Sequence, residues 1–354
     1  MLYQTSNPHG GDLYGRRVEL DFSVNTNPLG TPTSVVEAVR AAASSLCRYP
    51  DPACRELTEA LSTHEGVGAD CILCGSGAAE LIYSYCAVLG AERALLIAPS
   101  FSEYAAALAP AGISAQYYRL REENGFLLDE GFLKELGCCD CQAVFLCTPN
   151  NPTGQLIPPA LLREICRICQ KRGLRLFVDE CFLELSEGGM SLSGCLEDYP
   201  GLFLLKAFTK TYGMAGLRLG YCLTADRALL SAMSRMVQPW NVSLPAQLAG
   251  AAALREAKFL AEARALIRSE RPWMVEELEK LGFYVCPSQA NFLLLKSRTD
   301  LYVPLLERGI LIRDCSNYEG LGPGWYRVAV KRPEENRRLL AALGEIAGEP
   351  GGKT

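Results

Sequence analysis

The chain has 354 residues, of which 49% are hydrophobic and 21% are charged, and this composition excludes an intrinsically disordered protein. Its 35 basic and 40 acidic side chains give a net charge of −5 without any basic block, so neither nucleic acid nor an anionic membrane is expected as a partner. No uncharged apolar stretch is long enough to span a membrane, and the polar N-terminal sequence is not typical of a signal peptide, so we expect a cytoplasmic protein.

In chain order, the first 45 residues contain an irregular arm and one helical sequence, residues 34–46. From residue 55 to residue 240, short apolar runs alternate with amphipathic helical sequences. The runs predicted to be strands are residues 71–74, 94–99, 142–148, 174–180, 202–208 and 218–223. Such nearly continuous apolar strands are typical of a sheet that is buried on both faces, so the sequence predicts an α/β fold with a mostly parallel sheet.

The pattern changes after residue 245. Residues 246–282 read as one long helical stretch that is broken or bent near Pro272, and strand and helix patterns alternate from there to the C-terminus. We therefore predict a large domain over residues 46–245. Residues 1–45 and 246–354 are predicted to form the N-terminal arm and a smaller α+β domain, with the arm and its helix packed against that domain.

The 16 cysteines permit a different class of function. Cys71 and Cys74, and Cys166 and Cys169, have CxxC spacing, and residues 138–141 contain three cysteines, so a thiol-rich zinc or redox protein is an alternative. However, the first pair lies in a predicted strand and the second in a predicted helix, and the chain has only two histidines. Reduced, buried thiols without a metal are therefore the favoured interpretation.

Four motifs lie at the ends of predicted strands, where ligands bind in open α/β sheets. A turn sequence that contains Asn151 follows one strand, Asp179 ends the next, and Lys210 follows the third, with Arg218 eight residues later. Gly75–Ala79 is a glycine-rich turn before a helix, which suits a phosphate group. Taken singly, each motif also has a structural explanation: a plain turn, a helix N-cap, a surface lysine or a surface ion pair. Together they supply the amine, carboxylate, amide and phosphate-binding groups that pyridoxal 5'-phosphate (PLP) requires.

The order of these motifs resembles that of the aspartate aminotransferase superfamily, the PLP-dependent enzymes of fold type I. This resemblance implies a large domain with a mostly parallel seven-stranded sheet between helices, plus a smaller α+β domain. It also implies that Lys210 carries PLP as a Schiff base and that Asp179 pairs with the pyridine nitrogen, as the two catalytic residues. The implied cofactor-binding residues are Ser76, Gly77, Ala78, Phe101, Asn151, Asp179, Thr209, Lys210, Arg218 and Tyr49. Two positions depart from the superfamily pattern: Ala207 replaces a serine or threonine that touches the phosphate, and Phe182 replaces a tyrosine.

Further segments narrow the resemblance. His9-Gly10-Gly11 and residues 21–30, 48–51, 145–154 and 312–318 are similar to the threonine-phosphate decarboxylases of cobalamin biosynthesis, in which a phenylalanine also fits at position 182. The resemblance implies a homodimer with shared sites, in which Tyr49 reaches the cofactor phosphate of the neighbouring subunit.

The implied substrate-binding residues are His9, Gly10, Asn25, Asn151, Arg313 and Arg327. Among these, Arg327 would hold the α-carboxylate and Arg313 the phosphate of the substrate. The expected reaction is decarboxylation of L-threonine O-3-phosphate, or of a similar compound such as O-phosphoserine, to an amino-alcohol phosphate. Histidinol-phosphate aminotransferase, which shares the cofactor motifs and both C-terminal arginines, is the alternative enzyme. A PLP-binding protein without catalysis is a further alternative.

Overall fold

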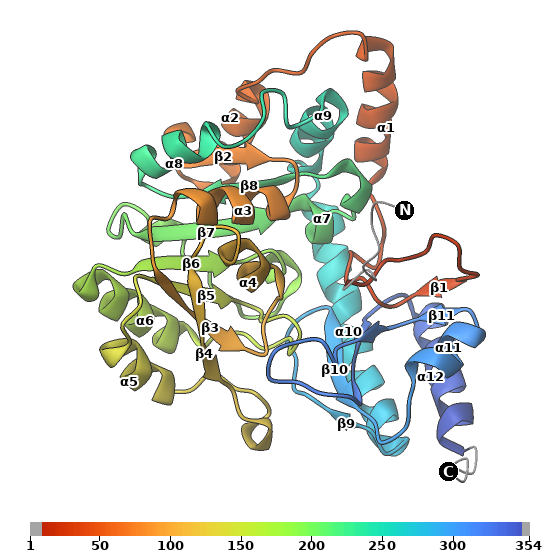
Figure 1. Ribbon diagram of the computed structural model, residues 1–354. Coiled ribbons are helices and arrows are strands. Elements are labelled where there is room, and N and C mark those ends of the chain that lie inside the picture. Colours follow the sequence, from red (N-terminus) through yellow and green to blue (C-terminus); the bar gives the residue numbers. More distant parts are fainter. Residues whose placement is uncertain (1–8, 349–354) are drawn as a thin grey trace.

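The computed structural model describes residues 9–348, which form a larger layered part and a smaller C-terminal part (Figure 1). The centre of the larger part is a seven-stranded sheet. Its strands, in spatial order, are β2 (Ile72–Gly75), β8 (Gly220–Leu223), β7 (Leu202–Ala207), β6 (Arg175–Asp179), β5 (Ala143–Cys147), β3 (Arg93–Ala98) and β4 (Ser114–Arg119). Only β8 runs antiparallel to its neighbours, so the predicted mostly parallel sheet is confirmed.

Helices cover both faces of this sheet. The helices of the larger part are α2 (Arg55–Glu65), α3 (Ala78–Val88), α4 (Glu103–Leu108), α5 (Gly131–Cys138), α6 (Pro159–Arg172), α7 (Phe208–Thr211), α8 (Arg227–Ser234) and α9 (Leu244–Ala253). In β5, Val144 and Leu146 face a core shared with α2, α5, α6 and α9. Ala143, Phe145 and Cys147 face the opposite core, formed with α3, α4 and α8. Every residue of β5 is buried because the strand is covered on both sides, and this explains its unbroken apolar sequence.

The register of the sheet brings the predicted motifs to one edge. Ala207 at the end of β7 lies opposite Gly220 at the start of β8, and Gly220 also lies opposite Gly75 at the end of β2. Cys147 at the end of β5 pairs with Asp179 at the end of β6. The segments that follow β2, β5, β6 and β7, and the segment that precedes β8, therefore meet at the same place.

The smaller part contains a four-stranded antiparallel sheet in the order β12-β13-β10-β9. Its elements are α10 (Ala257–Lys280), β9 (Tyr284–Val285), β10 (Phe292–Lys296), α11 (Tyr302–Glu307), β11 (Ile310–Leu311), β12 (Arg313–Asp314), β13 (Trp325–Ala329) and α12 (Pro333–Gly348). The predicted stretch is not broken at Pro272, because α10 continues through this residue and the chain leaves the helical conformation between α9 and α10 instead; a bend at Pro272 stays a prediction. A proline removes one backbone hydrogen bond, and the other turns of this 24-residue helix remain.

The N-terminal segment contacts both parts. Strand β1 (Leu20–Asp21) pairs in parallel with β11 of the smaller part, whereas α1 (Thr33–Ala42) packs against α9 (Figure 1). The prediction that the whole segment packs against the smaller part therefore holds for β1 and not for α1. Residues 1–8, which carry the polar N-terminal sequence, lie outside the described residues. Short 3-10 helices connect the main elements at Ala43–Ser45, Ala69–Cys71, Glu122–Asn124, Leu183–Leu185, Ser193–Cys195 and Ala215–Leu217.

All 16 cysteines are free thiols in this fold. Within residues 9–348, no group of three or more potential metal-binding side chains gathers at one place. Over the same range, no helix combines the length and the apolar character needed to cross a bilayer.

Candidate active site

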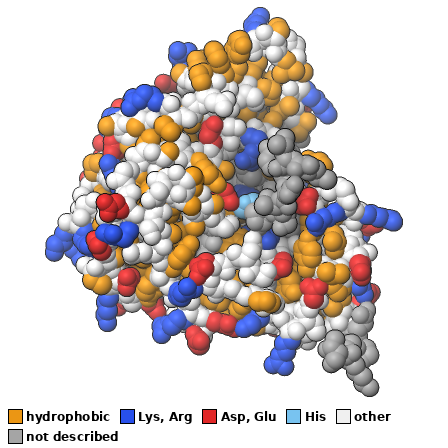
Figure 2. Space-filling model, in the orientation of Figure 1, with side chains coloured by type: hydrophobic (Ala, Val, Ile, Leu, Met, Phe, Trp, Pro, Cys, Tyr) orange, Lys and Arg blue, Asp and Glu red, His pale blue; other side chains and the backbone are white. Residues whose placement is uncertain are grey.

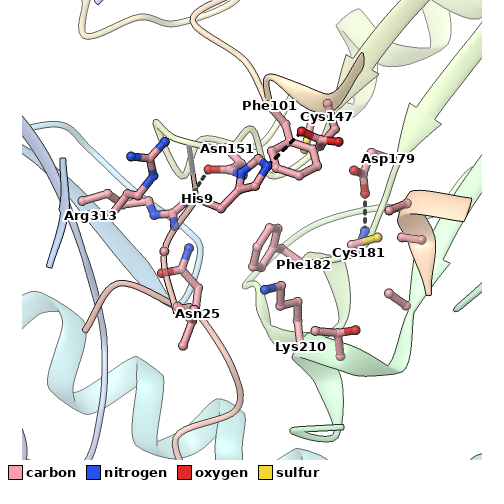
Figure 3. A pocket seen from close by; sticks show the side chains of 18 of the residues that line it. His9, Asn25, Phe101, Cys147, Asn151, Asp179, Cys181, Phe182, Lys210 and Arg313 are labelled. Atoms are coloured by element: carbon pink, nitrogen blue, oxygen red, sulfur yellow. Dashed lines mark hydrogen bonds and ion pairs between the residues drawn. The ribbon is translucent and has the colours of Figure 1, made fainter. Parts of the chain in front are cut away.

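A cavity of about 340 Å³ lies at the edge of the large sheet where the motifs meet. Figure 2 shows the molecule hollowed between its two parts, with basic side chains inside the hollow, and Figure 3 shows the cavity from close by. Of the predicted site residues, those that line it are His9, Gly10, Asn25, Ala78, Phe101, Asn151, Asp179, Thr209, Lys210, Arg218, Arg313 and Arg327. Residues from the N-terminal arm, the large sheet and the small sheet therefore share one cavity.

Lys210 lies in α7, directly after the buried strand β7. Its amine is 5.6 Å from the centre of the Phe182 ring and makes no hydrogen bond or ion pair within the described part of the chain. Burial lowers the pKa of Lys210 to about 8, and the nearby charges of Arg327 and Arg218 act in the same direction. The amine therefore loses its proton at a lower pH than an ordinary lysine does, as a nucleophilic lysine requires.

Asp179 ends β6 and is only 6% exposed. Its Oδ1 accepts a hydrogen bond of 2.9 Å from the backbone N–H of Cys181, and its Oδ2 accepts one of 2.7 Å from the Tyr104 hydroxyl (Figure 3 draws the first). Burial raises the pKa of Asp179, while these donors and the charge of Lys210 oppose the rise. The cavity wall therefore presents a carboxylate whose two oxygens each accept one hydrogen bond.

The start of α3 forms a cradle for an anion. The first residue before the helix, Gly77, has φ +83° and no side chain to cap the helix, so the N–H groups of the first turn are left for a ligand. A Cβ on Gly77 would lie 2.6 Å from Nη2 of Arg218, so the absence of a side chain allows this guanidinium to lie against the turn. A helix N-terminus and an arginine beside it suit a phosphate.

Three phosphate-binding residues were predicted in this turn, and one of them, Ala78, lines the cavity. The N–H of Ser76 donates to Oε2 of Glu80 over 2.7 Å, and the N–H of Gly77 donates to the Gly75 oxygen over 2.8 Å. These two N–H groups are engaged within the turn. Ala79, which belongs to the predicted glycine-rich turn but was not named as a cofactor-binding residue, lines the cavity as well.

The two predicted substrate arginines lie directly opposite each other in the register of β12 and β13, so their side chains share one face of the small sheet. Arg327 donates to Asn151 Oδ1, and its Nη2 donates to the Ser23 oxygen over 2.9 Å. Arg313 donates to Asn317 Oδ1 over 2.7 Å, and its guanidinium lies 5.3 Å from the centre of the Tyr318 ring. Both arginines are buried, so two cations line one side of the cavity.

The N-terminal arm closes another side of the cavity. His9 Nε2 lies 2.9 Å from Glu103 Oε1 at the start of α4, and this contact lowers the pKa of Glu103. Gly10 lies so close to Ser23 that a Cβ would come within 2.5 Å of the Ser23 oxygen. The amide of Asn25 is directed toward the cavity in Figure 3, and both of its polar atoms are buried without a hydrogen-bond partner among the described residues. Buried polar groups of this kind are normally satisfied, so this amide is available to a ligand.

Tyr49 lies outside the cavity. Its side chain is 78% exposed and stacks on Trp240 at a centroid distance of 4.5 Å. The contact of Tyr49 with a neighbouring subunit therefore stays a prediction.

Sequence reasoning missed several residues of the site, among them Glu103 and Tyr318, which line the cavity, and Tyr104, which contacts Asp179 behind it. Glu103 and Tyr104 follow the predicted aromatic Phe101 after one intervening residue. Their position in a segment that leaves a strand end was the available signal.

Residues 17–343 match the family of class I and II aminotransferases. The chain belongs to this family. The chain is 39% identical over 331 residues to a threonine-phosphate decarboxylase of Salmonella typhimurium, covering 92% of this chain and 91% of the relative. It is 37% identical over 338 residues to a histidinol-phosphate aminotransferase of Desulfitobacterium hafniense, covering 93% and 91%. The crystal structure of a histidinol-phosphate aminotransferase from Clostridium acetobutylicum superposes with a TM-score of 0.87 at 30% identity, covering 94% of this chain and all of that one.

Membership in this family makes the protein a PLP-dependent enzyme of fold type I. The cavity fits the cofactor, because it offers a lysine amine of lowered pKa, a buried carboxylate and a helix N-terminus with an arginine beside it. The amide of Asn25 and the Nε of Arg327 are also buried, and they have no hydrogen-bond partner among the described residues. A bound ligand could satisfy these polar groups.

Proposed function

We propose that this enzyme decarboxylates L-threonine O-3-phosphate, or a similar phosphorylated amino acid such as O-phosphoserine, to an amino-alcohol phosphate in cobalamin biosynthesis. The observation that carries the assignment of a phosphorylated amino acid as substrate is the pair of buried arginines, Arg313 and Arg327, opposite each other on one wall of the cavity. A substrate with a carboxylate and a phosphate needs two such cations at once. The identity of 39% to a threonine-phosphate decarboxylase supports the same assignment.

The cofactor-binding roles follow from the positions of the side chains. Lys210 would hold the cofactor aldehyde covalently, Asp179 would face the pyridine nitrogen, and Asn151 would bond the ring hydroxyl. The remaining wall would hold the ring and its phosphate through Phe101, Ala78, Ala79, Thr209 and Arg218. Thr209 and the backbone N–H groups would offset the loss of the hydroxyl at Ala207.

The substrate-binding roles depend on how firmly each arginine is held. Arg327 has its direction fixed by Asn151 and the Ser23 oxygen, so it suits the α-carboxylate, whose orientation decides which bond breaks. Arg313, with His9 and Asn25 nearby in the cavity, suits the phosphate. His9 would bring the N-terminal arm over the bound anion.

When bound, PLP supplies an electron-withdrawing ring that stabilises negative charge at the α-carbon of the substrate. The chain has to hold the carboxylate so that it leaves as CO2 and then to deliver a proton to the α-carbon. Lys210, with a pKa of about 8, carries a proton at neutral pH once its amine is free and is the residue placed to donate it.

Histidinol-phosphate aminotransferase is the second candidate, because the relative from Desulfitobacterium hafniense is nearly as similar in sequence. The size of the cavity favours the first candidate. At about 340 Å³, the cavity is at the small end of the range for ligand pockets, which begins at about 300 Å³, and it has to hold the cofactor as well as the substrate. A threonine side chain needs less of this space than an imidazole.

The test is to incubate the PLP-loaded enzyme with O-phosphothreonine and, separately, with histidinol phosphate plus 2-oxoglutarate. Release of CO2 from the first mixture without glutamate in the second supports decarboxylation. Glutamate without CO2 selects the aminotransferase. The Lys210→Ala variant is the control, since neither product should form without the amine.

We also propose that a second copy of the chain completes the site. Tyr49 and Trp240 form an exposed aromatic stack, and Leu46 and Met236 are exposed as well. Figure 2 shows hydrophobic side chains gathered near α1 and the chain that follows it. A surface of this kind marks a protein–protein contact, and a second copy would place its own Tyr49 at the cofactor phosphate.

Subunit mixing tests this dimer. If the sites are shared, inactive Tyr49→Ala and Lys210→Ala proteins regain activity when they are unfolded and refolded together, because the mixed dimer contains one site with both residues intact. Recovery no greater than that of each variant refolded alone refutes a shared site.

A further inference from the structure

The Tyr104 hydroxyl is buried behind the cavity wall, and neither of the two proposed reactions assigns a role to it. Tyr104 is fully buried in α4 and does not line the cavity. Its hydroxyl donates to Oδ2 of Asp179 over 2.7 Å. The hydroxyl therefore acts on a bound ligand through Asp179, whereas the Tyr104 ring contacts the cavity residue Phe101.

We infer that Tyr104 is a positioning residue that holds the Asp179 carboxylate ionised and in one orientation toward the cofactor's ring nitrogen. The inference rests on the family's cofactor and not on the choice between decarboxylation and transamination. It therefore stands or falls separately from the proposed function.

Burial makes the ionised form of the Asp179 carboxylate unfavourable unless hydrogen-bond donors compensate. Asp179 is almost removed from water, and a buried carboxylate without donors favours its neutral form. The backbone N–H of Cys181 holds Oδ1, and the Tyr104 hydroxyl holds Oδ2. Hydrogen bonds to an ionised acceptor are stronger than neutral ones, so the Tyr104 hydroxyl favours the charged form.

Tyr104 also restrains the orientation of the Asp179 carboxylate. The Tyr104 ring packs against Phe145, Phe177 and Phe101 at centroid distances of 5.9, 5.7 and 5.6 Å. This packing restrains the ring, and the hydroxyl is held within hydrogen-bond distance of Asp179. With one donor on each oxygen, the carboxylate cannot rotate without breaking a hydrogen bond, and its remaining lone pairs keep one direction.

The fold contains a matched control in Tyr85 of α3. Tyr85 is also fully buried and packs against Phe145 and Phe177, in the same core as Tyr104. Its hydroxyl, however, has no hydrogen-bond partner among the described residues. Replacing either tyrosine with phenylalanine removes one buried oxygen from the same core, but only one replacement affects Asp179.

The experiment measures ligand affinity. Cofactor-free Tyr104→Phe, Tyr85→Phe and the parent enzyme are titrated with PLP and with its 1-deaza analogue, in which a C–H group replaces the ring nitrogen. We expect Tyr104→Phe to bind PLP at least about tenfold more weakly, because it loses a hydrogen bond to a charged group. Its affinity for the analogue should not fall, because that ring has no nitrogen for the carboxylate to face. Tyr85→Phe should bind both ligands as the parent enzyme does.

An equal loss of affinity for both ligands in Tyr104→Phe would show that the tyrosine merely supports the fold, and it would overturn the inference. Unchanged affinity for both ligands would overturn it as well, because Asp179 would then hold its charge and orientation unaided. Urea unfolding of the cofactor-free variants separates these outcomes from a general loss of structure, for which the Tyr85→Phe protein sets the reference.

Discussion

The charged amine of Lys210 should lower the free energy of unfolding of the cofactor-free protein at neutral pH. The Lys210→Met substitution should remove this destabilisation. Burial lowers the pKa of Lys210 from 10.5 to about 8 in the folded protein. Between these two values the unfolded chain binds the proton more tightly, so the stability of the folded state increases as pH rises through this window. Below pH 8 the amine is protonated in both the folded and the unfolded state, and the full destabilisation is present. The pKa shift corresponds to about 3 kcal/mol, which is an upper bound because the Lys210 side chain is partly exposed.

The assay is urea unfolding of the cofactor-free protein, followed by circular dichroism at a series of pH values from about 7 to 11. Lys210→Met should be the more stable protein at neutral pH, and the difference should disappear by about pH 10.5. Lys206→Met is the control with the opposite sign. Lys206 Nζ lies 2.7 Å from Glu65 and 3.5 Å from Glu180, so its removal leaves buried carboxylates without their cation and should destabilise the protein by about 3–5 kcal/mol. Equal stability of the parent and Lys210→Met proteins across this range would refute the reasoning.

Two further substitutions test the anion-binding groups. Arg313→Lys should raise the KM for the phosphorylated substrate about tenfold or more, because lysine cannot donate two parallel hydrogen bonds to a phosphate. The absorbance of the bound cofactor should stay unchanged. An unchanged KM would contradict the assignment of Arg313. Gly77→Ala should weaken PLP binding by about tenfold, because the new Cβ would lie 2.6 Å from a guanidinium nitrogen at a residue with φ +83°. Gly216→Ala, where an added Cβ meets no atom within 4 Å, is the control and should bind PLP normally in the same titration.

The sheet was largely predictable because its central strands carry an unmistakable pattern. Strands β3, β5, β6, β7 and β8 are covered on both faces, so their sequences are mostly apolar. Strand β4 at the sheet edge was not predicted. It reads Ser-Ala-Gln-Tyr-Tyr-Arg and has no fully buried residue, so nothing in its sequence required burial on both faces. Edge strands lose this signal because one side remains open to water.

The site was predictable where a residue follows a strand directly, and less so where the partner comes from elsewhere. Asp179 and Lys210 could be found from their strand ends, whereas Tyr104 contacts Asp179 from a position 75 residues earlier in the chain. Only the packing of α4 on the sheet brings the two together. Similarly, the sequence of the glycine-rich turn could not show that Glu80 would occupy the N–H of Ser76, because this depends on the direction of a side chain one helical turn away.

In the proposed assignment, Arg327 sets the direction in which the substrate's carboxylate is held, and this direction would decide between decarboxylation and transamination. Its guanidinium is tied to Asn151, which follows β5 of the large sheet, and to the Ser23 oxygen of the N-terminal arm. A relative movement of the two parts by about an ångström would therefore turn the carboxylate against the cofactor plane, and a misplacement of this size can cost about a hundredfold in rate. Two enzymes of this family can thus share the cofactor residues and both arginines and still break different bonds. The residues that would decide the reaction are then the ones that fix Arg327, and one of them, Ser23, lies outside the sequence motifs for the cofactor.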